Sequence, residues 1–306
     1  MVDNIYSVDF PPGGDDLVVP FYPSTDIMSS QQEEDLIASS QGLLRYMVGP
    51  MISQMGLSDQ TTHPVHILDS ACGTGVLTQE LQKMLPKALL EESTFLCVDS
   101  AQSAVDLVSR RISDEGWTHT EVKQLDVTHS GLPAGSFTHV GLGMGLHIIS
   151  DPDAVLADIK RILKPGGIFG ASTPHPDSTF WMPDLRSAFA SFPFNAPFPS
   201  KVPMQLHDQG DWTSIEWIEA HLKAQGFSEV KVQAATGKHH VESTEDFIAT
   251  FGKTLSYFLP MWWDEETRAA HPVEEVKELV KDHLREKYRG EAWDLEWMLI
   301  YSTGRV

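Results

Sequence analysis

Short apolar runs alternate with amphipathic stretches through the middle of the chain. A short apolar run between polar or glycine-rich positions is typical of a buried strand, and apolar residues repeated every three or four positions are typical of a helix. Strands are predicted in this way at Val65–Leu68, Thr94–Val98, Glu121–Leu125, Phe137–Leu142 and Ile168–Ser172. Helices are predicted at Val76–Leu85, at Ser103–Ile112 and from Asp151 to Pro165-Gly166-Gly167. The alternation favours right-handed crossovers and a mostly parallel, doubly wound α/β sheet, whose ligands bind at the carboxyl ends of the strands.

Two later segments interrupt the alternation. Residues 174–213 are rich in proline and aromatic residues. Residues 243–290 follow a sixth predicted strand at Glu229–Ala235 and are expected to form two helices on either side of Tyr257–Trp263. A last strand is predicted at Trp293–Ser302. Because both segments lie between late strands, we interpret them as lid insertions that could cover the same strand ends.

The first part of the chain is expected to lie outside the sheet. Residues 1–30 are a polar lead with a turn at Pro11–Gly14, and apolar side chains recur at helical spacing over Gln31–Gln54. The expected organisation is the polar lead followed by a single domain over residues 31–306, with insertions at about 174–213 and 243–290.

Charge and cysteine content narrow the classes of protein. The chain has 43 acidic and 22 basic residues and a formal net charge of -21, which disfavours nucleic acid and anionic membranes as partners. Its two cysteines, Cys72 and Cys97, lie in apolar stretches and are expected to be buried thiols in a reducing compartment. No targeting segment and no run of about 18 apolar residues is visible. These features predict a soluble, cytoplasmic protein.

The segment from His66 to Gly75 carries the clearest chemical signal. A predicted strand ends at Asp69, and a turn containing Gly73 and Gly75 leads into a helix. Such a turn lets backbone N–H groups approach a ligand at the start of the helix. A dinucleotide site would favour a third glycine where this chain has Thr78, and no carboxylate just before the turn. An NAD(P)-dependent oxidoreductase is therefore the less favoured alternative.

Two further acids end the next two strands. Asp99 is placed to accept hydrogen bonds from the hydroxyls of a ribose. Asp126 could accept from the amine of an adenine, while Val127 packs against the ring. Together with Asp69, they suit a nucleoside that carries a positive charge.

These motifs together resemble those of class I methyltransferases that use S-adenosylmethionine. The residues that carry the resemblance are Asp69-Ser-Ala-Cys-Gly-Thr-Gly75, Asp99, Leu125-Asp126-Val127 and Arg161-Ile-Leu-Lys-Pro-Gly-Gly167. The chain departs from the family pattern at Ala71, where the first glycine is usual. The resemblance implies a Rossmann-like sheet of seven strands with the last strand antiparallel, the cofactor S-adenosylmethionine and the product S-adenosylhomocysteine.

A closer resemblance, over about residues 35–306, is to fungal small-molecule methyltransferases of the gliotoxin thiomethyltransferase type. It rests on phrases such as Asp114-Glu-Gly-Trp117, Thr138-His-Val140, Pro197-Phe-Pro199 and Tyr257-Phe-Leu-Pro260. In that group the acceptor is a sulfur nucleophile on a secondary metabolite, whereas relatives of the trans-aconitate type methylate a carboxylate. The resemblance implies a small organic acceptor and leaves its class open.

The class I resemblance also implies a set of cofactor-binding residues. The residues expected to contact the methionine part, the ribose and the adenine, in chain order, are Asp69, Ala71, Gly73, Gly75, Asp99, Ser100, Asp126, Val127 and Gly143.

The acceptor side is less determined. His147 and His175 follow the fourth and fifth strands and are candidate general bases, each weighed against a histidine that is simply hydrogen-bonded in the wall. A carboxylate acceptor would need cations such as Arg186 and Lys201. An aromatic or thiol acceptor would need an apolar box, for which Trp181, Trp212 and Trp262 are candidates.

Other readings remain open from the sequence. His239-His240 is interpreted as a solvated pair in a polar turn, and no spacing typical of metal ligands is present. The chain could be a regulator that keeps the fold without turnover. The aromatic insertions could also serve a homodimer contact.

Overall fold

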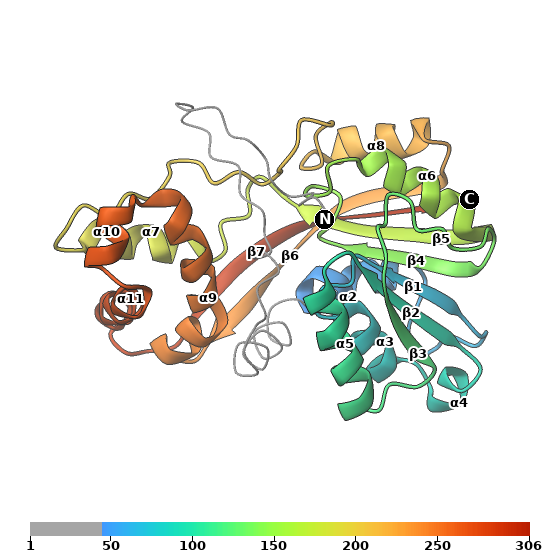
Figure 1. The fold of residues 1–306 in the computed structure, drawn as a ribbon, viewed down its shortest axis with the longest axis horizontal. Helices are drawn as coiled ribbons and strands as arrows, with labels where there is room; N and C mark the ends of the chain where they lie inside the picture. The colour runs from blue at the N-terminus through green and yellow to red at the C-terminus, as the bar shows by residue number, and fades with distance from the viewer. Residues whose placement is uncertain (1–44) are drawn as a thin grey trace, which may run out of the picture.

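The chain folds around one mixed sheet of seven strands (Figure 1). The computed structural model describes residues 45–306, apart from the side chains of Lys253, Thr254 and Tyr257. The polar lead and the first part of the predicted helix at Gln31–Gln54 lie outside the described residues. Across the sheet the strands are β3 (Thr120–Gln124), β2 (Thr94–Asp99), β1 (His66–Ser70), β4 (Phe137–Gly143), β5 (Leu163–Pro174), β7 (Trp293–Arg305) and β6 (Ser228–Val241).

Strand directions confirm the predicted fold class. β1 to β5 pair in parallel, and β7 runs antiparallel to both of its neighbours, β5 and β6. The order reverses beside β1, so β2 and β4 leave that strand on opposite sides. In open α/β sheets the crevice at this switch point is the usual ligand site.

Helices cover both faces of the sheet (Figure 1). One face carries the helices α2 (Arg45–Gln54), α3 (Val76–Met84), α4 (Lys87–Leu90) and α5 (Gln102–Asp114). The other face carries α6 (Pro152–Ile162) and α8 (Ile215–Ala224), which share its largest apolar cluster. Each face thus removes its strands from water, the usual arrangement for a mostly parallel sheet.

The last two strands extend well beyond the rest of the sheet. β7 pairs with β5 only from Leu299 onward, whereas it pairs with β6 from Trp293. Because β7 is antiparallel to β5, its first residues project past the carboxyl ends of the parallel strands. Four helices pack around this projection and form a separate lobe (Figure 1), namely α7 (Met182–Ser191), α9 (Thr244–Trp262), α10 (Glu265–Ala270) and α11 (Val273–Lys287).

The two predicted insertions meet in this lobe. Its core joins Phe189 of the first insertion to Phe251, Trp263 and Val280 of the second. A buried carboxylate, Asp184 of α7, fastens the two together. It accepts hydrogen bonds from Lys287 Nζ at 2.6 Å, Tyr288 Oη at 2.7 Å and Trp293 Nε1 at 3.0 Å.

Several predicted boundaries are wrong. The segment Tyr257–Trp263 was expected to separate two helices, but α9 runs through it to Trp262. Apolar residues at helical spacing along α9 pack into the lobe core, and Pro260 lies so near the end that only the last turn lacks its hydrogen bond. Helix α6 ends at Ile162, and the following Pro165-Gly166-Gly167 belongs to β5. β6 continues to Val241, six residues beyond the predicted Ala235.

Candidate functional site

A crevice opens where β1 and β4 end beside the start of α3. Its lining comes from three elements: the loop and first helical turn after β1, the helix α2, and the end of β4. The lining residues are Met47, Val48, Asp69, Ala71, Cys72, Thr74, Val76, Leu77 and Gly143. Three of the predicted cofactor residues, Asp69, Ala71 and Gly143, therefore face one space at the switch point of the sheet.

The loop after β1 is held in an unusual backbone conformation. Ala71, Gly73 and Gly75 all have positive φ angles, of 52°, 52° and 75°. Glycine adopts this region freely, whereas an L-residue such as Ala71 is strained there by roughly 1 to 2 kcal/mol. At Gly75 a Cβ atom would also stand 3.0 Å from the ring of Trp117, so this position needs glycine for space as well.

The carboxylate of Asp69 is buried at the base of the crevice, with 3% of the residue exposed. Its Oδ2 accepts from the backbone N–H of Thr78 at 3.1 Å and from the hydroxyl of Thr78 at 2.9 Å. Burial raises the pKa of Asp69 to about 7, although the hydrogen bonds from Thr78 act in the opposite direction. The crevice therefore holds a carboxyl group that changes charge near neutral pH.

Asp99 connects the loop to the end of β2. Its Oδ2 accepts from the backbone N–H of Gly73 at 2.9 Å, and its Oδ1 accepts from that of Ala101 at 3.0 Å. Each carboxylate oxygen has a second lone pair with which it could accept from a ribose hydroxyl. Ser100 follows directly, and its carbonyl accepts from Gln124 of β3.

Asp126 and Val127 lie just past the end of β3. Asp126 is exposed, and its Oδ1 accepts from the backbone N–H and the hydroxyl of Thr128 at 2.9 and 2.7 Å. Val127 packs against the main apolar cluster. The two residues thus lie after the third strand as predicted, in a turn stabilised by a local side-chain bond.

A buried arginine, Arg111, holds the glycine loop through a hydrogen bond to its backbone. No sequence motif had marked this residue. Arg111 of α5 is 2% exposed. One guanidinium nitrogen donates to the carbonyl of Thr74, while Nε donates to Glu115 at 2.7 Å. Its guanidinium lies 5.0 Å from the ring centre of Trp117. The available signal was a basic residue in register with the apolar Val105 and Val108 of the same helix.

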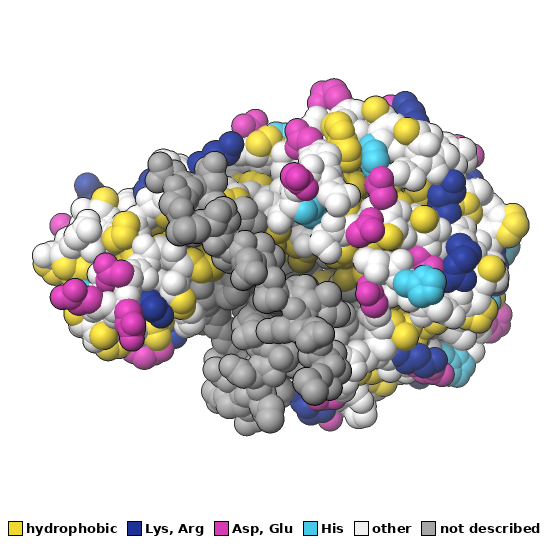
Figure 2. Space-filling model, turned by 45° about the horizontal axis from the view of Figure 1, so that its top comes forward, with side chains coloured by type: hydrophobic (Ala, Val, Ile, Leu, Met, Phe, Trp, Pro, Cys, Tyr) yellow, Lys and Arg dark blue, Asp and Glu magenta, His cyan; other side chains and the backbone are white. Residues whose placement is uncertain are grey.

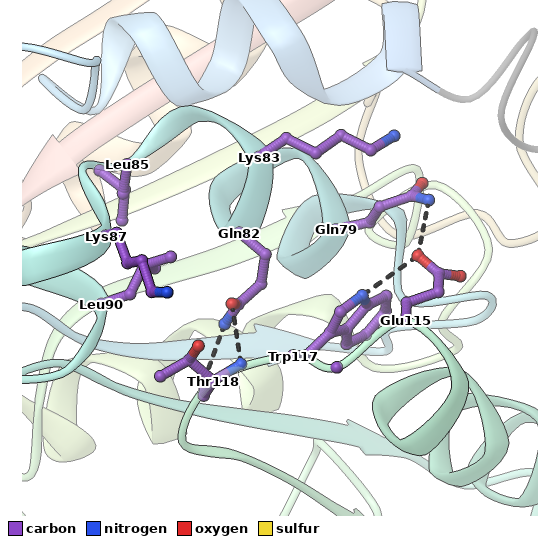
Figure 3. A pocket seen from close by; sticks show the side chains of 10 residues that line it. Gln79, Gln82, Lys83, Leu85, Lys87, Leu90, Glu115, Trp117 and Thr118 are labelled. Carbon is purple, nitrogen blue, oxygen red and sulfur yellow. Dashed lines mark hydrogen bonds between the residues drawn. The ribbon is translucent and has the colours of Figure 1, made fainter.

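Glu115 and Trp117, which contact Arg111, also line a second groove. Glu115 Oε2 accepts from Gln79 Nε2 at 3.0 Å and from Trp117 Nε1 at 3.1 Å (Figure 3). These residues line a groove of about 430 Å³ that shares no lining residue with the crevice. The bonds fix the Trp117 ring against Gly75.

The two candidate bases have different surroundings. His147 is 4% exposed and its Nδ1 is buried without a partner in the described structure. Burial lowers the pKa of His147 to about 3, and the nearby His207 adds to this effect. His175 directly follows β5, and its Nδ1 accepts from the backbone N–H of Asp177 at 3.1 Å. His147 is therefore neutral at physiological pH and a weak base.

The five predicted acceptor-binding residues do not all come together. Trp181 packs on Phe258, which stacks on Trp262. Arg186 joins this group, since its guanidinium lies 4.5 Å from the ring centre of Phe198, which in turn contacts Trp262. Lys201 is exposed. Trp212 is fully buried in the main core beside α8, because its ring packs on Trp217 and His221 there.

The prediction for His239-His240 is wrong in part. Both residues belong to strand β6 rather than a turn, in register with Leu295 and Asp294 of β7. Alternation along the strand exposes His240, whose Nδ1 lies 2.8 Å from Asp294 Oδ1, and buries His239. The projecting hairpin therefore gives the two histidines opposite environments.

Residues 45–306 contain neither a candidate metal cluster nor a candidate membrane span. Within that range no group of three His, Cys, Asp or Glu side chains could hold a metal ion. No helix in the described part of the chain is both long and apolar enough to cross a membrane. Acidic and basic side chains are interspersed over the face shown in Figure 2.

Comparison with known proteins agrees with this geometry. A family model described as a methyltransferase domain matches residues 67–167, from β1 into β5. Acetylaranotin bis-thiomethyltransferase from Aspergillus terreus is 27% identical over 274 residues, which are 88% of this chain and 93% of that protein. Demethylmenaquinone methyltransferase from Lactobacillus johnsonii is 33% identical over 183 residues, which are 57% of this chain and 73% of that enzyme.

A solved structure shares the fold. Phosphoethanolamine N-methyltransferase 2 from Haemonchus contortus, in complex with S-adenosyl-L-methionine, superposes with a TM-score of 0.51. The match covers 90% of this chain and 57% of that one at 14% identity. The sheet order, the glycine loop and these matches define a Rossmann-like methyltransferase fold. The chain belongs to the methyltransferase family, and fungal methyltransferases are among its homologues.

Proposed function

We propose that this methyltransferase transfers a methyl group from S-adenosylmethionine to an oxygen or sulfur atom of a small organic molecule. The observation that carries the proposal is the crevice itself. A glycine loop with three positive φ angles lies between Asp69 and Asp99, at the carboxyl ends of neighbouring strands. Backbone that a ligand can approach closely, next to carboxylates, suits an adenosyl group with a cationic sulfur.

The residues present fit that cofactor. Asp69 is a buried carboxyl group without a cation bonded to it in the described structure, and a positively charged ligand would favour its ionised form. Asp99 would bind the ribose, Asp126 and Val127 the adenine, and Gly73 and Gly75 the methionine part. When bound, S-adenosylmethionine supplies an electrophilic methyl group on a positively charged sulfur.

Positioning is the main task left to the protein. Alignment of an acceptor with the methyl group can contribute roughly 7 to 11 kcal/mol to lowering the barrier. The crevice walls from α2 and β4 would fix one partner. The lobe stands on the same carboxyl side of the sheet, which supports a role for both insertions in covering the acceptor and excluding water.

The chemical class of the acceptor is inferred from the homologues and from the bases available to this chain. One homologue is named a bis-thiomethyltransferase, which supports sulfur as a target here. A hydroxyl or a neutral thiol needs a base, and His147, with a pKa of about 3, is poorly matched to that task at neutral pH. His175, which directly follows β5 and is partly exposed, is the better candidate of the two predicted bases.

Binding of S-adenosylmethionine is expected to strengthen as pH rises through 7. The raised pKa of Asp69 means that the free protein holds a proton there at lower pH, and a cationic ligand displaces it. Affinity should rise about tenfold between about pH 6 and about pH 8. Calorimetry in two buffers of different ionisation enthalpy should detect the proton released at pH 7. In Asp69→Asn both the pH dependence of the affinity and the proton release should vanish. Proton release that persists in this variant would come from another group.

Loss of Asp99 is expected to weaken binding of the methyl-donor cofactor and not to create binding of NADH. Asp99→Ala should reduce the affinity for S-adenosylhomocysteine by about 1 to 3 kcal/mol, because the ribose hydroxyls lose their acceptor. Asp106→Ala, on the exposed side of α5, is the matched control. Titration with NADH should give no binding in any variant. Tight NADH binding with none for S-adenosylhomocysteine would overturn the proposed function.

The acceptor class can be read directly. Small carboxylic acids, phenols and thiols are incubated with methyl-labelled cofactor, and the class that takes up label is identified. Label in phenols or thiols is the expected result. Uptake by none of these classes, with cofactor binding intact, would favour a regulator without turnover.

A further inference from the structure

Two buried ring nitrogens lie unsatisfied on neighbouring strands of the projecting hairpin. His239 of β6 and Trp297 of β7 are each only 8% exposed. His239 Nε2 and Trp297 Nε1 both lack a hydrogen-bond partner in the described structure. Buried polar groups in native proteins are nearly always paired, so two such atoms on paired strands of one hairpin indicate a place where something else binds.

The two rings lie within the reach of one small molecule. Trp297 is paired with Gly237, and its indole lies flat over that glycine, with Nε1 2.9 Å from where a Cβ would stand. His239 lies two residues beyond Gly237 in β6, on the same face of the strand, with about 7 Å between the two Cα atoms. Gly237 is therefore the residue that allows the indole to lie beside the imidazole.

An aromatic ring already covers both of them. Tyr46 of α2 stacks on Trp297 with ring centres 5.2 Å apart, and it meets His239 edge-on at 6.0 Å. Tyr301 Oη donates to the backbone carbonyl of Tyr46. The backbone of Tyr46 is thus held by Tyr301. The Tyr46 hydroxyl accepts from Arg45 at 3.1 Å in an exposed pair, which a rotation of the ring would break. Phe180 and Phe251 of the lobe complete the wall, with ring centres 6.3 and 6.0 Å from that of His239.

The position relative to the crevice is suitable for a methyl acceptor. Trp297 precedes by two residues Leu299, the residue of β7 that pairs with Pro174 at the end of β5. It therefore stands just beyond the carboxyl edge, between the sheet and the lobe. The residues next to Tyr46, Met47 and Val48, line the crevice. The two places are therefore less than one helical turn of α2 apart.

We propose that His239 and Trp297 bind the methyl acceptor, an aromatic compound that carries a neutral hydroxyl or thiol and takes the place of the Tyr46 ring. This inference rests on the proposed function. A hydroxyl or thiol can accept from the indole N–H and donate to the imidazole nitrogen, so one group satisfies both atoms. Tyr46, itself a phenol, shows that an aromatic ring fits.

Charge argues against an anionic acceptor here. Burial lowers the pKa of His239, so its imidazole is neutral at physiological pH. The groups that face it have mixed signs: Asp246 of α9 raises this pKa, and Arg45 and His240 lower it. A carboxylate can accept from the single N–H of a neutral imidazole, but only a protonated imidazole would supply a compensating charge, and burial disfavours that form. The net charge of -21 also repels anions over the whole chain.

The test observes the indole N–H directly. The full chain is labelled with ¹⁵N-tryptophan, and the Trp297 resonance is assigned by its loss in Trp297→Phe. Phenol, phenylmethanethiol and benzoate are then titrated, with and without S-adenosylhomocysteine. A saturable downfield shift with phenol or the thiol is expected, weakened at least tenfold in His239→Phe and unchanged within twofold in His240→Phe. Tyr46→Ala should saturate at lower probe concentration.

Several results would overturn the inference. They are a Trp297 resonance that neither phenol nor the thiol moves, a shift that is equal in His239→Phe, a shift with benzoate alone, or weaker saturation in Tyr46→Ala. Calorimetry with S-adenosylhomocysteine on the same variants separates this failure from failure of the proposed function. The cofactor affinity of Trp297→Phe and His239→Phe should stay within twofold of the unaltered chain. Loss of cofactor binding in the unaltered chain would refute the proposed function instead.

Discussion

Replacing Asp184 by alanine is expected to destabilise the protein by about 3 kcal/mol, because it removes a buried acceptor shared by three donors, one of which, Trp293, is itself buried. The carboxylate is 2% exposed and holds Lys287 Nζ, Tyr288 Oη and Trp293 Nε1 at 2.6 to 3.0 Å. These donors come from the end of α11 and the start of β7, while Asp184 belongs to α7. One substitution therefore removes a polar link between the two insertions, while their shared apolar core remains. Urea unfolding followed by tryptophan fluorescence measures the loss.

A matched acid in the same lobe provides the control. Asp282 of α11 is exposed and bonds only to Arg285, three residues along its own helix, at 2.7 Å. Exposed pairs of this kind contribute about 0.5 kcal/mol or less, so Asp282→Ala should unfold close to the unaltered chain. Equal midpoints for Asp184→Ala and Asp282→Ala would mean that the hydrogen bonds to Asp184 do not stabilise the lobe.

Replacing Gly75 by alanine is expected to weaken binding of S-adenosylhomocysteine at least tenfold. The added methyl group meets the Trp117 ring at 3.0 Å and Val108 at 3.2 Å, and the φ of 75° is unfavourable for any L-residue. Trp117 cannot easily move, because its indole donates to Glu115 and its ring lies against Arg111. The loop itself must shift, at a total cost of about 2 to 4 kcal/mol. Calorimetry measures the loss of cofactor affinity, and thermal unfolding measures the loss of stability.

Another glycine separates backbone strain from crowding. Gly56, just after α2, has a φ of 81°, and nothing lies within 4 Å of a Cβ built there. Gly56→Ala should therefore lose only the conformational part, roughly 1 kcal/mol of stability, and leave cofactor affinity unchanged. If Gly75→Ala binds as tightly as Gly56→Ala, the loop is not held rigidly by Trp117.

The parts of the fold that follow from local pattern were predicted well. Each of the seven strands was located from its apolar run, and the antiparallel last strand followed from the family resemblance. Residues of the glycine loop were also found, because a turn that needs glycine leaves a local signature at Gly73 and Gly75. The predicted strand ends were less accurate where a strand extends beyond the parallel part of the sheet, as β6 does.

Residues whose role depends on distant partners were missed or misplaced. Arg111 is buried because α5 presses it against Thr74, 37 positions earlier in the chain. Trp212 was expected beside Trp181 and Trp262, yet it packs under α8, since an aromatic side chain can join any apolar cluster within reach. His239 and His240 looked alike as a pair until strand pairing turned them to opposite faces.

The sequence by itself determined the class of sheet, the glycine loop and the acids that end its strands. These depend on spacing between near neighbours, because strand alternation and turn conformation are set by local backbone geometry. Only the tertiary structure decided that two insertions merge into one lobe around Asp184, and that Tyr46, His239 and Trp297 meet beyond the sheet edge. Such meetings depend on the packing of segments up to 251 positions apart, from Tyr46 to Trp297, and no local pattern encodes which apolar faces will pair.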